Sequence, residues 1–166
     1  MDIRFSIADE EVLSALHRLA QSATPAKMRP VMNEIGVALT ESTKRRFDTS
    51  TGPDGNPWPA LEQSTLLARL SKASKKGATA AMNTKPLIET RELSTTIHHQ
   101  IVNGGSAVDI GTNRKFDEGK NVGAEVHQFG TKNGRIPERP FLGLSESDKT
   151  SVLNSLTRFL EGQIRP

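Results

Sequence analysis

A long apolar stripe in the first third of the chain constrains the fold more than any other sequence feature. Thr24-Pro25 is a strong helix start, because a hydroxyl can cap the helix and Pro is favoured at its first position. The residues that follow repeat at the three- and four-residue spacing of one buried helix face: Met28, Val31, Met32, Ile35, Ala38, Leu39 and Ser42. A helix over residues 26–47 would be about 33 Å long. The rest of the chain has to be packed along a rod of this length.

Three basic residues, Lys44-Arg45-Arg46, lie in the last turns of this predicted helix. Positive charge is favourable at a helix C-terminus, where the backbone carbonyls point outward. We therefore expect a solvated helix end here.

Two further regions predict a small sheet. Residues 3–7 alternate apolar and polar side chains, which is typical of a half-buried strand. Residues 95–102 are rich in β-branched side chains, and they are followed by Asn103-Gly104 and by a second alternating run over residues 107–111. A strand, an Asn-Gly turn and a strand predict a β-hairpin.

The C-terminal part of the chain predicts one more helix. Ser145 and Asp148 have the spacing of a capping box, and an apolar stripe follows them. The whole pattern predicts an α+β fold in which a small antiparallel sheet, made of the N-terminal strand and the hairpin, is packed by the long helix and a C-terminal helix. Long loops connect these elements, and we treat residues 1–166 as a single domain.

Residues 48–59 contain three Pro and two Gly, which predicts a loop with several tight turns. The only Trp of the chain, Trp58, lies between two of these prolines. We expect its ring to anchor the loop on the body of the protein, and ligand stacking is the less favoured alternative. A short helix over residues 65–72 should follow, with Leu66, Leu67 and Leu70 on its apolar side.

Residues 124–145 hold two compact phrases, His127-Gln128-Phe129-Gly130 and Arg139-Pro140-Phe141-Leu142-Gly143. A Phe favours burial, and a Gly often marks backbone that a side chain would block. We therefore predict a docked corner. Its structural anchors, with Trp58, are Phe129, Gly130, Pro140, Phe141 and Gly143. His127, Gln128 and Arg139 are expected to make polar contacts, either with neighbouring backbone or at a subunit boundary.

Charge is segregated in the middle of the chain. No acidic residue lies between Glu62 and Glu89, and residues 71–85 form a small, basic stretch that includes Lys72, Lys75 and Lys76. One interpretation is a flexible, soluble loop, and the other is a basic arm that contacts an acidic partner surface or a phosphate backbone. The arm has no aromatic residues for base stacking, which argues against sequence-specific nucleic-acid recognition.

Composition excludes several classes of site. The chain has no Cys, so it forms no disulfide and no thiolate metal centre. His98 and His99 are adjacent on a predicted strand and face opposite ways, and no other ligand spacing is recognisable. There is no phosphate-binding loop, dinucleotide fingerprint or nucleophile elbow. We predict no catalytic residue, no metal and no cofactor.

The remaining compositional features concern location and assembly. The N-terminus lacks the apolar core of a signal peptide, and no run approaches the length of a membrane span, so we expect a soluble cytosolic product. Hydrophobic residues make up 34% of the 166 residues, which is a thin core for this length. Either part of the chain is extended or loosely ordered, or contacts with neighbouring subunits supply part of its stability.

The order of these motifs resembles the phage virion morphogenesis family, the tail completion proteins of contractile-tailed phages and Mu-like prophages. The resemblance rests on a long helix ending in Arg46-Phe47, the loop Gly52-Pro53-Asp54-Gly55-Asn56-Pro57-Trp58, the hairpin, and the two phrases of residues 124–145. It extends from the long helix to the end of the chain.

The resemblance implies an assembly function. Such proteins complete the head-proximal end of the tail tube and sheath and prepare it to join the head, as rings of an α+β tail-terminator or connector type. A hexamer, with tail tube, sheath and head–tail connector proteins as partners and the virion as location, is the expectation that follows. The basic arm would line the lumen through which DNA passes or, as we favour, bind an acidic tail-protein surface. The alternative is a small prophage-encoded nucleic-acid-binding or regulatory module.

Overall fold

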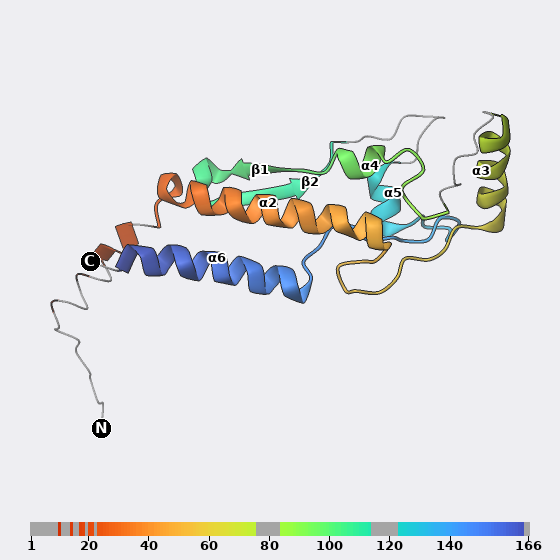
Figure 1. Ribbon diagram of the computed structural model, residues 1–166. Helices are drawn as coiled ribbons and strands as arrows, with labels where there is room; N and C mark the ends of the chain where they lie inside the picture. Colours follow the sequence, from red (N-terminus) through yellow and green to blue (C-terminus); the bar gives the residue numbers. More distant parts are fainter. Residues whose placement is uncertain are drawn as a thin grey trace, which may run out of the picture.

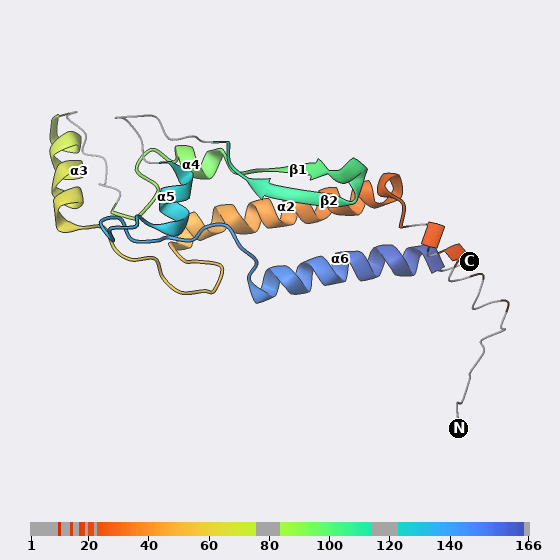
Figure 2. The ribbon, with the colours of Figure 1, turned by 180° about the vertical axis from the view of Figure 1, so that it is seen from behind.

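The computed structural model describes residues 23–75, 84–113 and 123–164, together with positions 10, 14, 17, 18, 20 and 21. The predicted strand over residues 3–7 lies outside the described residues, as do residues 76–83 of the basic arm. In the described part, helix α2 (Pro25–Thr49) runs along the length of an elongated molecule (Figure 1). The other elements lie beside this helix or gather at its C-terminal end, as the view from behind also shows (Figure 2).

The ends of α2 follow from local chemistry. Pro25 occupies the first turn, and Ser50 ends the helix in a left-handed conformation with φ 57° while its N–H bonds the carbonyl of Arg46. The buried stripe includes Val31, Met32, Ile35 and Leu39, as predicted. Ala38 is exposed, contrary to the prediction. Gly36, Thr40 and Thr43 are buried in addition, because α2 is covered on two sides rather than one.

The hairpin covers one of these sides. Strands β1 (His98–Val102) and β2 (Ala107–Gly111) pair antiparallel, with His98 opposite Gly111 and Val102 opposite Ala107. A two-stranded hairpin is only marginally stable alone, so its packing on α2 matters. A Cβ at Gly36 would lie 2.5 Å from Cδ2 of His99, and the glycine therefore allows β1 to approach the helix. The predicted hairpin and the α+β class are confirmed.

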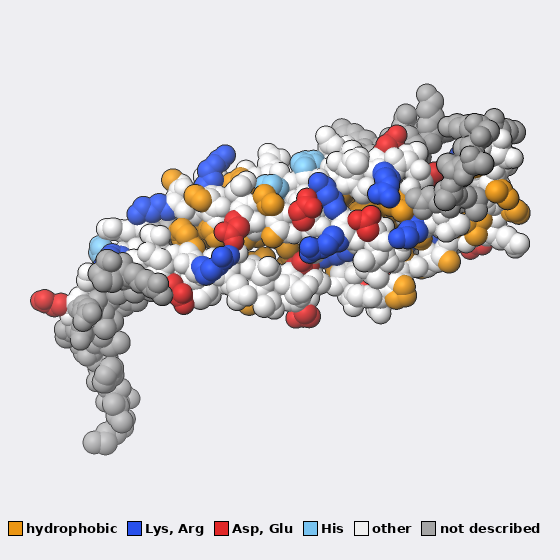
Figure 3. Space-filling view, in the orientation of Figure 1, with side chains coloured by type: hydrophobic (Ala, Val, Ile, Leu, Met, Phe, Trp, Pro, Cys, Tyr) orange, Lys and Arg blue, Asp and Glu red, His pale blue; other side chains and the backbone are white. Residues whose placement is uncertain are grey.

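Helix α6 (Glu146–Ile164) covers the other side and runs antiparallel to α2 (Figure 1). Its side chains Val152, Leu156 and Phe159 pack on the buried stripe of α2. On the outer surface, acidic and basic side chains are interspersed over the two helices (Figure 3). One such pair joins them directly, with Arg158 donating a 2.6 Å hydrogen bond to Glu34.

The C-terminal end of α2 is surrounded by loops and short helices: α3 (Gln63–Lys75), α4 (Glu92–Thr95) and α5 (Ala124–Phe129). Helix α3 stands apart from the long helices at this end of the molecule (Figures 1 and 2). It starts two residues before its predicted beginning and ends three residues after its predicted end. Of the predicted apolar side, Leu66 is half-buried, whereas Leu67 and Leu70 are 59% and 52% exposed.

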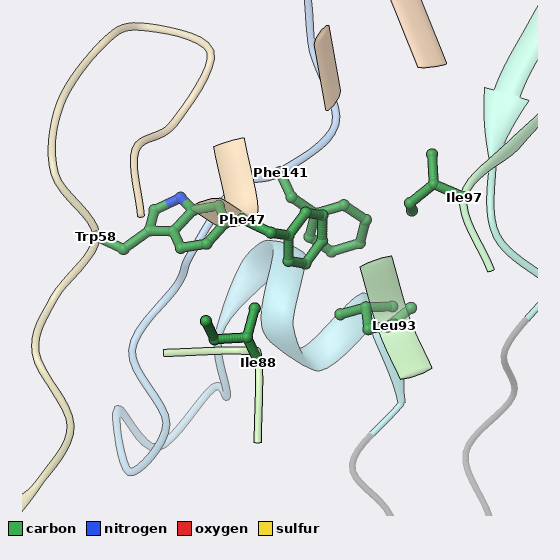
Figure 4. Close-up of a cluster of buried hydrophobic side chains, with 7 residues drawn as sticks. Phe47, Trp58, Ile88, Leu93, Ile97 and Phe141 are labelled. Carbon is green, nitrogen blue, oxygen red and sulfur yellow. The ribbon is translucent and has the colours of Figure 1, made fainter. Parts of the chain in front are cut away.

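An aromatic cluster fills the space between these loops and α2 (Figure 4). The rings of Phe47 and Trp58 meet edge to face with centroids 5.5 Å apart, and Phe47 and Phe141 are 5.4 Å apart. Such ring pairs add to the stabilisation from burial itself. Ile88, Leu93, Ile97 and Ala124 complete the cluster. The loops of this end are therefore organised around a core of their own.

Candidate functional site

The predicted corner over residues 124–145 lies at the C-terminal end of α2, where its second phrase enters the aromatic cluster. Phe141 has no exposed surface, and Trp58 is 6% exposed. The indole N–H of Trp58 donates a 2.8 Å hydrogen bond to the carbonyl of Pro140. The Trp loop and the corner are therefore joined by a ring contact network and by a hydrogen bond.

Arg46 contradicts the expectation of a solvated helix end, because it is 5% exposed. Its guanidinium donates to the carbonyls of Phe141 and Gly143 at 2.8 and 2.9 Å, and to Asp148 at 2.5 Å. Lys44 and Arg45 remain partly or fully exposed. Arg46 is drawn inward because the loop backbone around Phe141 has no strand or helix to satisfy its carbonyls.

Asp148 is the buried counter-charge of Arg46. Burial alone would raise the pKa of its carboxyl group, but hydrogen bonds from Ser42 and Ser145 and the positive charge of Arg46 hold that pKa below its ordinary value. The predicted capping box is present, since Ser145 Oγ accepts the N–H of Asp148 at 3.1 Å and Asp148 accepts the N–H of Ser145 at 2.9 Å. Burial also lowers the pKa of Arg46, and Asp148 opposes that shift.

Gln128 is satisfied within its own chain. Its side-chain carbonyl accepts the N–H groups of Phe141 and Leu142 at 3.0 and 2.9 Å, and its amide donates to the carbonyl of Leu142 at 3.0 Å. Contact with neighbouring backbone, one of the two alternatives for this residue, is present in the single chain. The three bonds hold the second phrase of the corner against α5.

Arg139 is also buried, with 5% of its surface exposed. Its side chain donates to the carbonyls of Pro59 and Ala60 at 2.8 and 2.9 Å, and its backbone N–H donates to the carbonyl of His127 at 2.7 Å. Burial lowers the pKa of the guanidinium, the positive charge of Arg69 lowers it further, and Glu62 opposes these effects. Within the described residues, Arg139 forms no ion pair.

Phe129 is 75% exposed, so the prediction that it anchors the corner by burial is wrong for the single chain. The reason is the phase of the short helix α5. Its inward face carries Ala124 and Gln128, which are four residues apart, and Phe129 is turned away from that face.

The two corner glycines lie where a side chain would collide. Gly130 has φ 72°, and a Cβ there would lie 2.9 Å from the backbone nitrogen of Glu138. Gly143 has φ 146°, and its Cβ would lie 2.8 Å from Cγ of Pro53. Both positions favour glycine for conformation and for space.

A cleft of about 370 Å³ lies between α3, the segment before α4, and the corner. Its apolar lining comes from Leu61, Leu87, Leu93, Ile136 and Pro137. Its ionisable lining comes from Arg69, Arg135, Arg139, Glu62, Glu89 and His127. Two residues of the predicted site, His127 and Arg139, therefore meet here. Arg69 and Arg135 were not predicted to belong to this site, and the acid-free stretch after Glu62 is the one sequence signal that points to Arg69.

The basic arm is partly neutralised where the structure describes it. Lys72 and Arg69 both lie 3.3 Å from the carboxylate of Glu89, and Arg69 also donates to the carbonyl of Lys85. Lys75 is the last residue of α3, and Lys76 lies outside the described residues. Glu89, the first acidic residue after the acid-free stretch, thus forms ion pairs with Arg69 and Lys72 from within that stretch.

The described residues also bear on metal binding and on membrane insertion. Among them, no group of three or more His, Asp or Glu side chains is arranged to hold a metal ion. In the same part of the chain, no helix has both the length and the apolar character needed to cross a membrane.

Comparison with known proteins assigns a family. Residues 7–161 match the model of the phage virion morphogenesis family. The chain is 28% identical over 157 residues to "Mu-like prophage FluMu G protein 2" of Haemophilus influenzae, an alignment that covers 92% of this chain and 91% of that protein. No solved structure matches. The motifs that carry the resemblance, from Arg46-Phe47 to the corner, lie within the matched residues, and the chain belongs to the phage virion morphogenesis family.

Proposed function

We propose that this protein completes the phage tail. It acts as a ring of subunits at the head-proximal end of the tail tube and sheath, and it prepares that end to join the head. Membership of a virion morphogenesis family and likeness to a Mu-like prophage protein support a role in virion assembly. Six subunits would match a six-fold tail end. The protein would be assembled in the host cytoplasm, become part of the virion, and contact tube, sheath and connector proteins.

The observation that carries the ring proposal is apolar surface left uncovered by the single chain. Leu67 and Leu70 on α3 are more than half exposed, and Phe129 at the end of α5 is 75% exposed. Apolar side chains also reach the surface over α3 in the space-filling view (Figure 3). Helix α5 lies beside the C-terminal end of α2, and α3 stands apart from α2 at the same end of the molecule (Figure 1). Contact with a neighbouring subunit would remove these side chains from water, which is favourable by about 25 cal/mol per Å².

Two features described above fit the same role. Buried arginines and aromatic rings join the loops at the end of the molecule that carries α3, which would support α3 in a contact with a neighbour. The pairing of Glu89 with Arg69 and Lys72 reduces the positive charge of the arm, which supports a protein partner over a phosphate backbone for that segment. We therefore retain an acidic tail-protein surface as the partner of the arm, and contact with DNA in the lumen as the alternative.

The test changes the exposed leucines and follows tail completion. The double variant Leu67→Ser/Leu70→Ser should fold normally, because both side chains are already exposed. In the phage that encodes this chain, it should give tails of uncontrolled length or tails without heads, seen by electron microscopy. The matched control is Leu153→Ser on α6, which changes a leucine that is 63% exposed. Normal, head-joined tails from the double variant would contradict the ring contact that we propose for α3.

A second measurement addresses the alternative class of function. A hexamer mass in solution, or ring-shaped particles, would favour the tail role. A salt-dependent shift of duplex DNA at physiological ionic strength, without either of these, would favour a nucleic-acid-binding module.

A further inference from the structure

The cleft between α3 and the corner has the features of a binding site rather than of a packing defect. It is about 370 Å³ in volume, and its lining combines an apolar floor with ionisable groups at several positions. Clefts of this kind are the usual sites for ligands and peptide segments. Its walls come from segments far apart in the sequence, and Arg139 joins two of them through its hydrogen bonds to Pro59 and Ala60.

Charge in the cleft is unbalanced. Three arginines, Arg69, Arg135 and Arg139, line it, and two glutamates, Glu62 and Glu89, face them, which leaves one positive charge. Glu89 is already engaged with Arg69. Arg139 is 5% exposed and, within the described residues, has carbonyl partners but no carboxylate partner. Burial of this guanidinium is costly, and Glu62 opposes only part of the effect of burial and of Arg69, so a bound anion would offset more of that cost.

We propose that this cleft binds an acidic peptide segment of a neighbouring virion protein. One Asp or Glu carboxylate of the segment lies against Arg135 and Arg139, and flanking apolar side chains rest on Leu61, Leu87 and Leu93. The identity of the partner as a virion protein rests on the proposed function. The chemistry of the segment rests on the cleft alone.

The lining favours a peptide over nucleic acid. A phosphate backbone carries one charge per nucleotide, and Glu62 and Glu89 would repel all but the first of these charges. Sugar and phosphate are polar and would gain little from the apolar lining, and none of the lining residues is a Phe, Tyr or Trp on which a base could stack. A peptide with a single carboxylate would neutralise the one net positive charge of the cleft, and apolar neighbours of that carboxylate would pack on the apolar lining.

Two positions allow the cleft to be changed without disturbing the fold. Arg135 lines the cleft and is exposed to solvent, so Arg135→Glu reverses a charge at the rim of the cleft. Thr65 on α3 lines the cleft and is exposed, so Thr65→Trp fills part of the volume. Ser64→Trp places the same ring on the neighbouring exposed position, which does not line the cleft, and serves as the matched control. Arg139 itself is avoided, because its loss would also release the loop at residues 59–60.

The test begins with a displayed library of random heptapeptides selected on the purified full-length protein. The expected result is enrichment of peptides with one Asp or Glu next to Leu, Ile, Val or Phe. Selection should persist on Ser64→Trp and disappear on Thr65→Trp. Enrichment without an acid, no enrichment, or enrichment unchanged by Thr65→Trp would overturn the proposal.

A selected peptide then serves as the probe in a calorimetric titration. Replacement of its acid by the corresponding amide should weaken binding, and Arg135→Glu should weaken it by about tenfold or more, as expected for juxtaposed like charges. Competition by a DNA oligonucleotide at physiological salt, with equal binding of the amide peptide, would assign the cleft to phosphate instead. These measurements use the isolated protein, so a negative result would contradict peptide binding in the cleft without contradicting the role in tail completion. Conversely, normal tails from the α3 leucine variant would contradict the ring contact without contradicting peptide binding in the cleft.

Discussion

The two halves of α2 pack against their neighbouring segments through different kinds of contact. In the N-terminal half and the middle of the helix, an aliphatic cluster of Val31, Met32, Ile35 and Leu39 is covered by a hairpin and a helix. In the C-terminal half, Phe47 packs with aromatic rings that come from loops. Regular elements satisfy their own backbone groups, whereas loops need side chains to do so.

The difference explains where the buried polar residues are. Arg46, Gln128 and Arg139 all donate to backbone carbonyls of loops at the C-terminal end of α2. At the other half, the ion pair between Glu34 and Arg158 lies at the surface, with both side chains more than half exposed. Charged groups at the loop end are therefore part of the core, whereas the charged pair at the helical end is not.

The largest effect is expected from Phe141→Ala. The side chain is fully buried and touches the ring of Phe47, so its removal leaves a cavity that loops cannot close without losing their hydrogen bonds. We expect a loss of about 4 kcal/mol in the free energy of unfolding, measured by urea denaturation. Met32→Ala, at the helical end, should cost about 2–3 kcal/mol, because side chains of adjacent helices can relax into the space. Equal losses would remove the distinction between the two ends.

A smaller and pH-dependent effect is expected from Asp148→Asn. The change removes the counter-charge of buried Arg46 and should cost about 3 kcal/mol at pH 7. The folded pKa of Asp148 lies below its ordinary value, so the ionised carboxylate stabilises the fold above the unfolded pKa of about 3.9. That stabilisation is lost as the pH falls through the folded pKa.

Urea titrations from pH 7 to pH 3 measure this dependence. The stability gap between the natural protein and Asp148→Asn should narrow below about pH 4. Glu146→Gln, in the same helix turn but with a side chain that is 89% exposed, is the control and should show little change at any of these pH values. A gap that stays constant across the range would mean that Asp148 acts by shape rather than by charge.

The smallest effect is expected from Glu34→Gln at the helical end. The variant loses the exposed pair with Arg158, and exposed pairs contribute about 0.5 kcal/mol. Thermal unfolding should shift by a few degrees at most, and the shift should vanish in about 1 M salt because the charges are screened. A loss as large as that of Asp148→Asn would show that surface pairs hold this fold as strongly as buried ones.

Local sequence patterns predicted the regular elements well. The stripe from Met28 to Leu39, the Asn103-Gly104 turn and the capping box at Ser145 each depend on residues within a few positions of one another. Such short-range signals determine where a helix or hairpin begins and ends. Phe141 and Trp58 were also predicted to be buried, because large apolar rings in loops rich in Pro and Gly are stabilised by packing on the body of the protein.

Contacts between distant segments could not be read in the same way. Arg46 was expected in solvent, yet its partners Phe141 and Asp148 are 95 and 102 residues away along the chain. Phe129 was expected in the core, but the phase of a six-residue helix depends on which face the rest of the protein covers. The cleft combines side chains from four separate segments, and no spacing in the sequence brings Arg69 to Arg139.

From the sequence we could predict the long helix, the hairpin, the aromatic corner and the family to which the chain belongs, because each rests on local chemistry or on an ordered set of short motifs. Which polar residues are buried and which apolar residues are left exposed depends instead on contacts between segments that are far apart along the chain. Burial of Arg46 and Arg139 follows from the carbonyls of loops that need partners. Leu67, Leu70 and Phe129 are exposed because no other part of the described chain packs over these side chains of α3 and of the end of α5.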